Sequence, residues 1–125
     1  MILNREQIEF LQFTTRDKKD FSKIKECVSV YEKRNNRREL IGLAGTVKRY
    51  EIVNSVFLAI GQEFQGKGFG TELFKKLWEN EKPKPMLTCY KDNTPALRIY
   101  LKYYFFVPYF HNKVLGIPKW WVQDE

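Results

Sequence analysis

One glycine-rich segment of the sequence has the composition of a phosphate-binding loop. It runs from Gly61 to Thr71 and lies between an apolar run of strand length, 53–60, and a pattern of helical period. Backbone N–H groups at a helix N-terminus attract anions, and glycines let the backbone approach them without a Cβ in the way. The segment is therefore predicted to bind phosphate, with Lys67 either as a companion cation or as a solvated lysine.

Two familiar phosphate motifs do not fit this segment. A P-loop needs Ser or Thr after its Gly-Lys pair, but Gly68 follows Lys67, so the hydroxyl that binds magnesium is missing. The dinucleotide fingerprint needs a third glycine, and its position is taken by Thr71 or Leu73, depending on the starting glycine. A nucleotide hydrolase and a dinucleotide-dependent enzyme are therefore disfavoured.

A third pattern does fit. Gln65-x-x-Gly68-x-Gly70 resembles the acyl-CoA-binding signature of the GNAT superfamily of N-acetyltransferases, which follows the fourth strand of their fold. The resemblance implies acetyl-CoA as co-substrate, a β-bulge near the end of that strand, and strand amides that hold the reacting carbonyl oxygen. The implied cofactor-binding residues are Leu58, Ala59, Ile60, Gln65, Gly66, Lys67, Gly68, Phe69, Gly70 and Thr71. The alternative is a glycine-rich turn that merely lets strand and helix pack.

A second match lies downstream, in the order that the family requires. Asn93-x-x-Ala96-x-x-x-Tyr100-x-Lys102 resembles the motif that opens the helix after the fifth strand. The resemblance implies that Tyr100 is the general acid that protonates the departing thiolate, and that Asn93 and Lys102 contact the cofactor. From the residues alone, Tyr100 is equally a core aromatic, and Asn93 either contacts adjacent backbone or forms a turn before the helix.

One departure from the family pattern concerns the end of this helix. The family usually has Gly before the Phe that closes the motif, whereas this chain has Tyr104 before Phe105. A left-handed residue after the helix is therefore less easily formed, and we expect the helix to end differently.

No residue is an obvious base for deprotonating an amine acceptor. The GNAT family often uses a Glu on its fourth or fifth strand. By this resemblance Glu51, at the start of the fourth expected strand, is one candidate, whereas the comparable position of the fifth strand holds Thr88 or Cys89, which are poor bases. His111 is the single histidine and is expected in a late, partly exposed turn. A Cys89–His111 nucleophilic pair lacks an acid to orient the histidine, so deprotonation through water is the default.

The spacing of apolar residues predicts the elements that position these groups. Residues 28–31 fit either a helix or a strand. The other expectations are a strand at 8–13, a helix from Asp20 to Val28, a hairpin with its turn at 34–38 and a strand at 40–47, a strand at 53–60 buried on both faces, an amphipathic helix burying Leu73, Phe74, Leu77 and Trp78, a strand at 86–90, a helix from Thr94 to about Tyr103 with Thr94 as its cap, and extended segments at 105–111 and 119–123.

These elements indicate a mixed α/β fold in a single domain over residues 1–125. The resemblance implies a central, mixed but mostly antiparallel sheet flanked by helices and splayed between its fourth and fifth strands, 53–60 and 86–90. It also implies an N-acetyltransferase that moves an acetyl group from acetyl-CoA to a primary amine by direct attack. The acceptor stays open: a small molecule, a protein or an aminoacyl-tRNA.

The charge balance points to a polyanionic partner. The chain has 22 Lys and Arg against 15 Asp and Glu, a net charge of +7. The phosphates of coenzyme A account for part of this excess. Two alternatives are a catalytically idle CoA sensor and a nucleic-acid-binding module that uses the basic residues around the hairpin; these are Arg34, Arg37, Arg38, Lys48 and Arg49.

Composition excludes several other classes of protein. No apolar run approaches the ~18 residues of a membrane span. The two cysteines, Cys27 and Cys89, are too few for a disulfide scaffold or a zinc site, so no metal and a cytoplasmic setting are expected. Trp120 and Trp121 near the C-terminus are candidates for an acceptor pocket, for the seam of a homodimer, or for packing within the chain.

Overall fold

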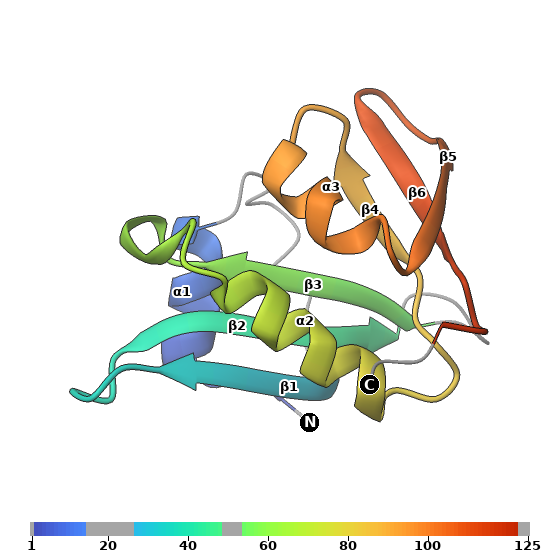
Figure 1. Ribbon diagram of the computed structural model, residues 1–125. Helices are drawn as coiled ribbons and strands as arrows, with labels where there is room; N and C mark the ends of the chain where they lie inside the picture. Colours follow the sequence, from blue (N-terminus) through green and yellow to red (C-terminus); the bar gives the residue numbers. More distant parts are fainter. Residues whose placement is uncertain (1, 15–26, 49–53, 123–125) are drawn as a thin grey trace.

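The computed structural model describes residues 2–14, 27–48 and 54–122 (Figure 1). As predicted, the architecture is mixed α/β. Its elements are α1 (Arg5–Thr14), β1 (Cys27–Arg34), β2 (Leu40–Lys48), β3 (Asn54–Ile60), the 3₁₀ turn η2 (Gln62–Phe64), α2 (Phe69–Asn80), β4 (Leu87–Tyr90), α3 (Thr94–Tyr100), β5 (Tyr104–Pro108) and β6 (Lys113–Pro118).

The described strands form two antiparallel sheets, in the orders β1-β2-β3 and β4-β6-β5. A short parallel bridge between Ser55 and Met86 joins them. There the Val56 N–H donates to the Met86 carbonyl oxygen and the Met86 N–H donates to that of Asn54, both at 2.9 Å. Beyond this bridge β3 and β4 separate (Figure 1), which confirms the predicted splay between the strands at 53–60 and 86–90.

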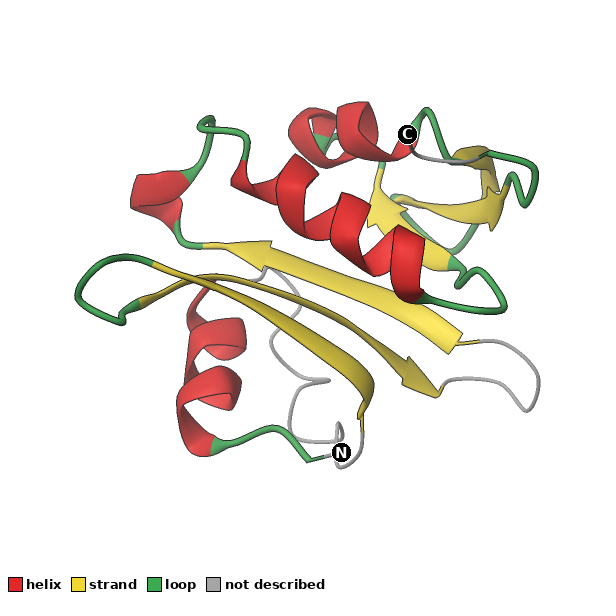
Figure 2. Cartoon of the chain, turned by 60° about the horizontal axis from the view of Figure 1, so that its bottom comes forward, coloured by secondary structure: helices red, strands yellow, loops and turns green. Residues whose placement is uncertain are grey.

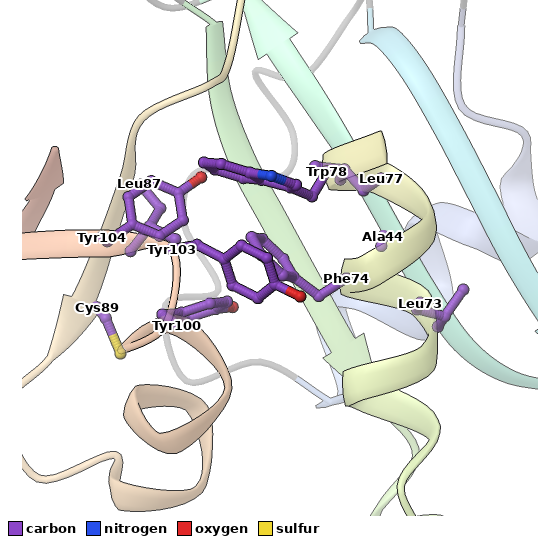
Figure 3. Packing of buried hydrophobic residues seen from close by; sticks show 10 residues of the cluster. All are labelled: Ala44, Leu73, Phe74, Leu77, Trp78, Leu87, Cys89, Tyr100, Tyr103 and Tyr104. Carbon is purple, nitrogen blue, oxygen red and sulfur yellow. The ribbon is translucent and has the colours of Figure 1, made fainter. Parts of the chain in front are cut away.

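Helices cover both faces of the β1-β2-β3 sheet, with α2 on one side and α1 on the other (Figures 1 and 2). The predicted apolar stripe of α2 is confirmed, because Leu73, Phe74, Leu77 and Trp78 are all buried. These side chains share one core with aromatic residues from α3 and β5 (Figure 3). That core holds the second sheet against α2.

The predicted strand at residues 8–13 is wrong, because this segment belongs to α1. The Gln7 N–H donates to Asn4 Oδ1 at 2.8 Å, and the Asn4 N–H donates to Gln7 Oε1 at 2.9 Å. This reciprocal capping box starts the helix, and Leu11, four residues after Gln7, is fully buried. The local cap therefore outweighs the alternating pattern.

The hairpin is confirmed, with its turn between β1 and β2. Asn35 Oδ1 accepts from the N–H groups of Arg37 and Glu39, both at 3.0 Å, and so fixes the turn. The ambiguous residues 28–31 are strand, paired with β2. Of the helix predicted from Asp20 to Val28, residues 20–26 lie outside the described residues, and its end is wrong because Val28 belongs to β1.

The C-terminal part differs from the prediction at its boundaries. The cap of α3 is Asn93 rather than Thr94, and the helix ends at Tyr100 rather than Tyr103. The extended segment predicted at 105–111 is shorter, as β5, while β6 lies at 113–118 and was not predicted. The segment predicted as extended from residue 119 is a turn, in which the Val122 N–H donates to the Lys119 carbonyl oxygen at 3.0 Å.

Candidate active site

A cavity of about 970 Å³ lies where β3 and β4 separate. This volume is at the upper end of the range for ligand pockets. Its walls come from β3, the loop before α2, the first turn of α2, β4 and α3. They include nearly all residues predicted for the site: Leu58, Ala59, Ile60, Gln65, Gly66, Gly68, Phe69, Gly70, Thr71, Asn93, Tyr100 and Lys102.

The loop before α2 has the backbone shape of an anion cradle. Gly66 and Gly68 have φ angles of 80° and 86°, a region that favours glycine. Gly68 is the N-cap residue of α2 and provides no side-chain cap. The first N–H groups of α2 therefore lack a capping side chain, and Phe69, Gly70 and Thr71 line the cavity. An anion at this helix end would find free donors and a favourable dipole.

Gln65 fastens this loop to the end of β3. Its Nε2 donates to the Ile60 carbonyl oxygen at 3.1 Å. The Gly61 N–H donates to the Ile41 carbonyl oxygen at 2.9 Å, which continues the β2–β3 pairing into the loop. The structure thus gives the Gln65 side chain a positioning role within the chain.

The direction of the backbone N–H groups alternates along β3, and this decides which of the predicted strand amides point to the cavity side. The Val56 N–H points toward β4, where it meets Met86, and every second N–H of a strand points to the same side. The N–H groups of Leu58 and Ile60 therefore point to the cavity side beyond the bridge, whereas that of Ala59 points to β2.

The predicted burial of β3 on both faces is only partly correct. Both faces are covered by helices, but within β3 only Ser55 and Ala59 are buried. The other side chains are half-buried because this strand forms a wall of the cavity.

The described cavity wall is basic. Lys75, Arg98, Lys102 and Lys113 line it, while no Asp, Glu or His is among its described lining residues. Arg98 was not predicted for the site; it lies in the last turn of α3, whereas Lys102 lies in the turn that follows this helix. Lys67, which was predicted for the site, is exposed and is absent from the described wall; its Nζ lies 5.9 Å from the Phe64 ring centroid.

Tyr100 lies in the cavity wall at the edge of the aromatic core (Figure 3). Its side chain is 6% exposed, and its ring contacts the edge of Phe74, with ring centroids 5.0 Å apart. Burial, with a smaller contribution from Cys89, raises the pKa of the Tyr100 phenol well above its usual value. The hydroxyl therefore stays protonated at neutral pH.

Comparison with known proteins decides the family. A sequence model described as the Acetyltransferase (GNAT) family matches residues 2–105. The chain belongs to the GNAT family. Membership confirms the predicted family, whose members are acyl-CoA-dependent acetyltransferases that use acetyl-CoA. No curated protein sequence gives a significant match.

Solved structures share the GNAT fold at low sequence identity. An IAA acetyltransferase from Bacillus cereus is 14% identical, with a TM-score of 0.68 over 86% of this chain and 87% of that one. A Bacillus subtilis acetyltransferase in complex with CoA is 16% identical, with a TM-score of 0.68 over 93% of this chain and 91% of that one. A mutant spermidine N-acetyltransferase from Vibrio cholerae is 19% identical, with a TM-score of 0.56 over 71% of this chain. This chain spans 64% of that protein's length.

The departure from the GNAT pattern at Tyr104 has a structural explanation. The Tyr104 hydroxyl donates to the Pro85 carbonyl oxygen at 2.7 Å and ties β5 to the loop before β4. As expected, α3 ends without a left-handed residue: Leu101 is right-handed, and the Tyr103 N–H donates to the Tyr100 carbonyl oxygen at 2.9 Å. A buried tyrosine thus replaces the usual glycine at this GNAT helix end.

The GNAT β-bulge implied by the resemblance is not present in β3. Its register with β2 runs without a shift from Asn54, opposite Lys48, to Ile60, opposite Gly42. The cavity instead follows from the early end of the β3–β4 pairing.

The described lining of the cavity contains no strong base. Burial, with a smaller contribution from Asp92, raises the pKa of Cys89 to about 11, so this residue is a neutral thiol near pH 7. His111 is exposed in the turn between β5 and β6, with a φ of 52°. Glu51 lies outside the described residues. Among the described residues no group of His, Cys, Asp and Glu side chains is placed to hold a metal ion, and no described helix could span a membrane.

Replacing Asn93 by alanine is expected to lower the free energy of unfolding by about 1 kcal/mol. Asn93 Oδ1 accepts from the Ala96 N–H at 3.4 Å and caps α3, the helix that carries Tyr100. Urea denaturation of the wild type and of Asn93→Ala measures the loss, and Asn93→Ser, which keeps a capping oxygen, is the control. Equal stability of wild type and Asn93→Ala would contradict the capping role.

Proposed function

We propose that this GNAT-family chain transfers an acetyl group from acetyl-CoA to a primary amine by direct attack on the thioester. The observation that carries the proposal is a single cavity that combines an uncapped helix N-terminus, a basic wall and a buried, protonated tyrosine. Acetyl-CoA, when bound, supplies an acetyl group activated as a thioester.

Two groups of residues would bind the cofactor phosphates. The N–H groups at the start of α2, at Phe69, Gly70 and Thr71, line the cavity and would hold the pyrophosphate. Arg98, on α3, and Lys102, in the turn after it, would add positive charge at the same wall. The described wall contains no carboxylate, although Asp92 lies close enough to Cys89 of the wall to raise its pKa.

The reacting carbonyl would lie along β3. The N–H groups of Leu58 and Ile60 point to the cavity side and are suited to receive the carbonyl oxygen as it gains negative charge. Tyr100 would donate its proton to the leaving sulfur, because its phenol is neutral at physiological pH. Water would take the proton of the attacking amine, with Glu51 as the alternative base.

Binding and transfer can be measured separately. We expect calorimetry to show acetyl-CoA binding that weakens as salt concentration rises, because the wall is basic. Mass spectrometry then follows acetylation across a panel of primary amines: amino acids, spermidine, lysine peptides and an aminoacyl-tRNA. Spermidine is included because one structural neighbour acts on it by name.

Each alternative function has its own outcome in this experiment. Acetyl-CoA binding without transfer to any amine favours a CoA sensor, an alternative that the absence of a carboxylate or imidazole from the described cavity lining supports. Salt-dependent RNA binding without acetyl-CoA affinity favours a nucleic-acid-binding module. Absence of both kinds of binding would overturn the proposal.

A further inference from the structure

The β4-β6-β5 sheet has one face that no described helix covers. Side chains alternate across a strand, and Tyr104 and Phe106 of β5 pack in the core with α2. Phe105 and Val107 therefore point to the opposite side, where they pair in register with Ile117 and Leu115 of β6. In Figure 1 this side of β5 and β6 faces away from α3.

This outer face is apolar and exposed, and we define it by five residues. The exposed fractions are 51% for Phe105, 39% for Val107, 39% for Ile117, 74% for Trp120 and 55% for Trp121. The patch is contiguous, because the Trp121 ring centroid lies 5.6 Å from that of Phe105 and 5.0 Å from that of Trp120. Contiguous apolar patches of this kind mark interaction sites.

The two tryptophans belong to a fixed turn. The Lys119 N–H donates to the Tyr103 carbonyl oxygen at 2.7 Å, and the Val122 carbonyl oxygen accepts from Trp78 Nε1 at 3.2 Å. Both ends of the turn are thus bonded to the core, while Trp120 and Trp121 between them point outward. A partner would meet a preformed surface.

The area of the outer face matches what a stable dimer needs. From the exposed fractions, its three aromatic and two aliphatic side chains present about 400–550 Å² of apolar surface. A standard interface buries about 800 Å² per partner, of which about 60% is apolar, or about 500 Å². One copy of this face therefore supplies about the apolar area that each partner contributes to a standard interface.

We propose that the outer face is the interface of a homodimer, in which two copies pack this sheet face against each other around a twofold axis. Two identical sheet faces are self-complementary under such an axis. The Lys119 Nζ lies 4.8 Å from the Phe105 ring centroid and donates to the Leu101 carbonyl oxygen at 3.3 Å, so one charged group borders the apolar surface of each copy. Val107 and Ile117 provide no surface for base stacking, so a second copy fits this face better than RNA does.

Sedimentation velocity from about 1 to about 100 µM tests the dimer. We expect the wild type to dimerise and Trp120→Glu to raise the dimer dissociation constant by about 30-fold or more, as for the loss of a central anchor. Phe13→Glu is the matched control, because Phe13 is 89% exposed on α1, outside this face, and it should dimerise like the wild type. Trp120 is outside the described cavity lining, so acetyl-CoA binding should be unchanged in Trp120→Glu.

Tryptophan fluorescence adds a readout that needs no substitution. Trp78 is buried, so acrylamide quenching reports on Trp120 and Trp121, and it should fall as dimers form. A wild type that is monomeric throughout, a wild-type dimer whose quenching equals that of the monomer, or a Trp120→Glu variant that dimerises as tightly as the wild type would overturn the proposal. So would a monomer that binds phosphatidylserine vesicles or single-stranded RNA through Trp120, which would assign the face to lipid or nucleic acid.

Discussion

Replacing Tyr100 by phenylalanine is expected to lower kcat by about 10²–10⁴-fold, the usual contribution of a positioned general acid. The substitution removes the proton donor but keeps the ring that contacts Phe74. Acetyl-CoA affinity should change little, because the phosphates would bind at the glycine loop and α2. Steady-state kinetics with an amine identified in the screen, together with calorimetry of acetyl-CoA binding, measures both quantities.

Tyr104→Phe is the matched control for this prediction. Tyr104 is also buried, its pKa is also raised by burial, and its hydroxyl bonds to the Pro85 carbonyl oxygen. It is not among the described residues that line the cavity. Its loss should lower the free energy of unfolding by about 1 kcal/mol while kcat is kept. Unchanged turnover in Tyr100→Phe, with product release shown to be fast, would remove Tyr100 from the mechanism.

Replacing Gly68 by valine is expected to weaken acetyl-CoA binding by about 100-fold or more. The φ of 86° at this position costs a residue with a side chain about 1–2 kcal/mol. Apart from the adjacent residues, no described atom lies within 4 Å of a Cβ built there, so the valine methyl groups would project into the open space in front of α2 where we propose that the phosphates bind. Calorimetry measures the affinity, and circular dichroism confirms that the fold is kept.

Lys67→Ala is the control for the glycine loop. Lys67 is adjacent to Gly68 but exposed and absent from the described cavity wall, so its loss should change the affinity by less than about threefold, as for an exposed charge. If Gly68→Val bound acetyl-CoA as tightly as the wild type, the loop would not be the phosphate site.

The parts of the fold that could be predicted from the sequence are those in which several residues close together in the chain form one recognisable pattern. The helix α2 has two i,i+4 apolar pairs, from Leu73 to Trp78, directly after the glycine loop, and both features are local in the chain. The strand predicted at residues 8–13 failed because alternation over six residues competes with the capping box of Asn4 and Gln7, a specific start signal.

The residues predicted for the site lie together where one motif holds several of them. The glycine loop and the Asn93–Lys102 motif place their residues by local chain geometry, so nearly all of them line the cavity. Lys75 and Lys113 were missed because the cavity wall brings together α2 and β6, which are distant in sequence. The different orientations of the Leu58 and Ala59 amides depend on the pairing with Met86, a long-range contact.

The short bridge between Ser55 and Met86 has a mechanical consequence. Among the described strands it is the one point of direct pairing between the two sheets, and the aromatic core behind it provides the other link. A bound molecule that hydrogen-bonds to the N–H groups of Leu58 and Ile60 would extend β3 toward β4 and act as the missing strand. Ligand binding and stiffness would then be coupled: without a ligand one bridge and the aromatic core join the two sheets, and a bound ligand would add hydrogen bonds along β3.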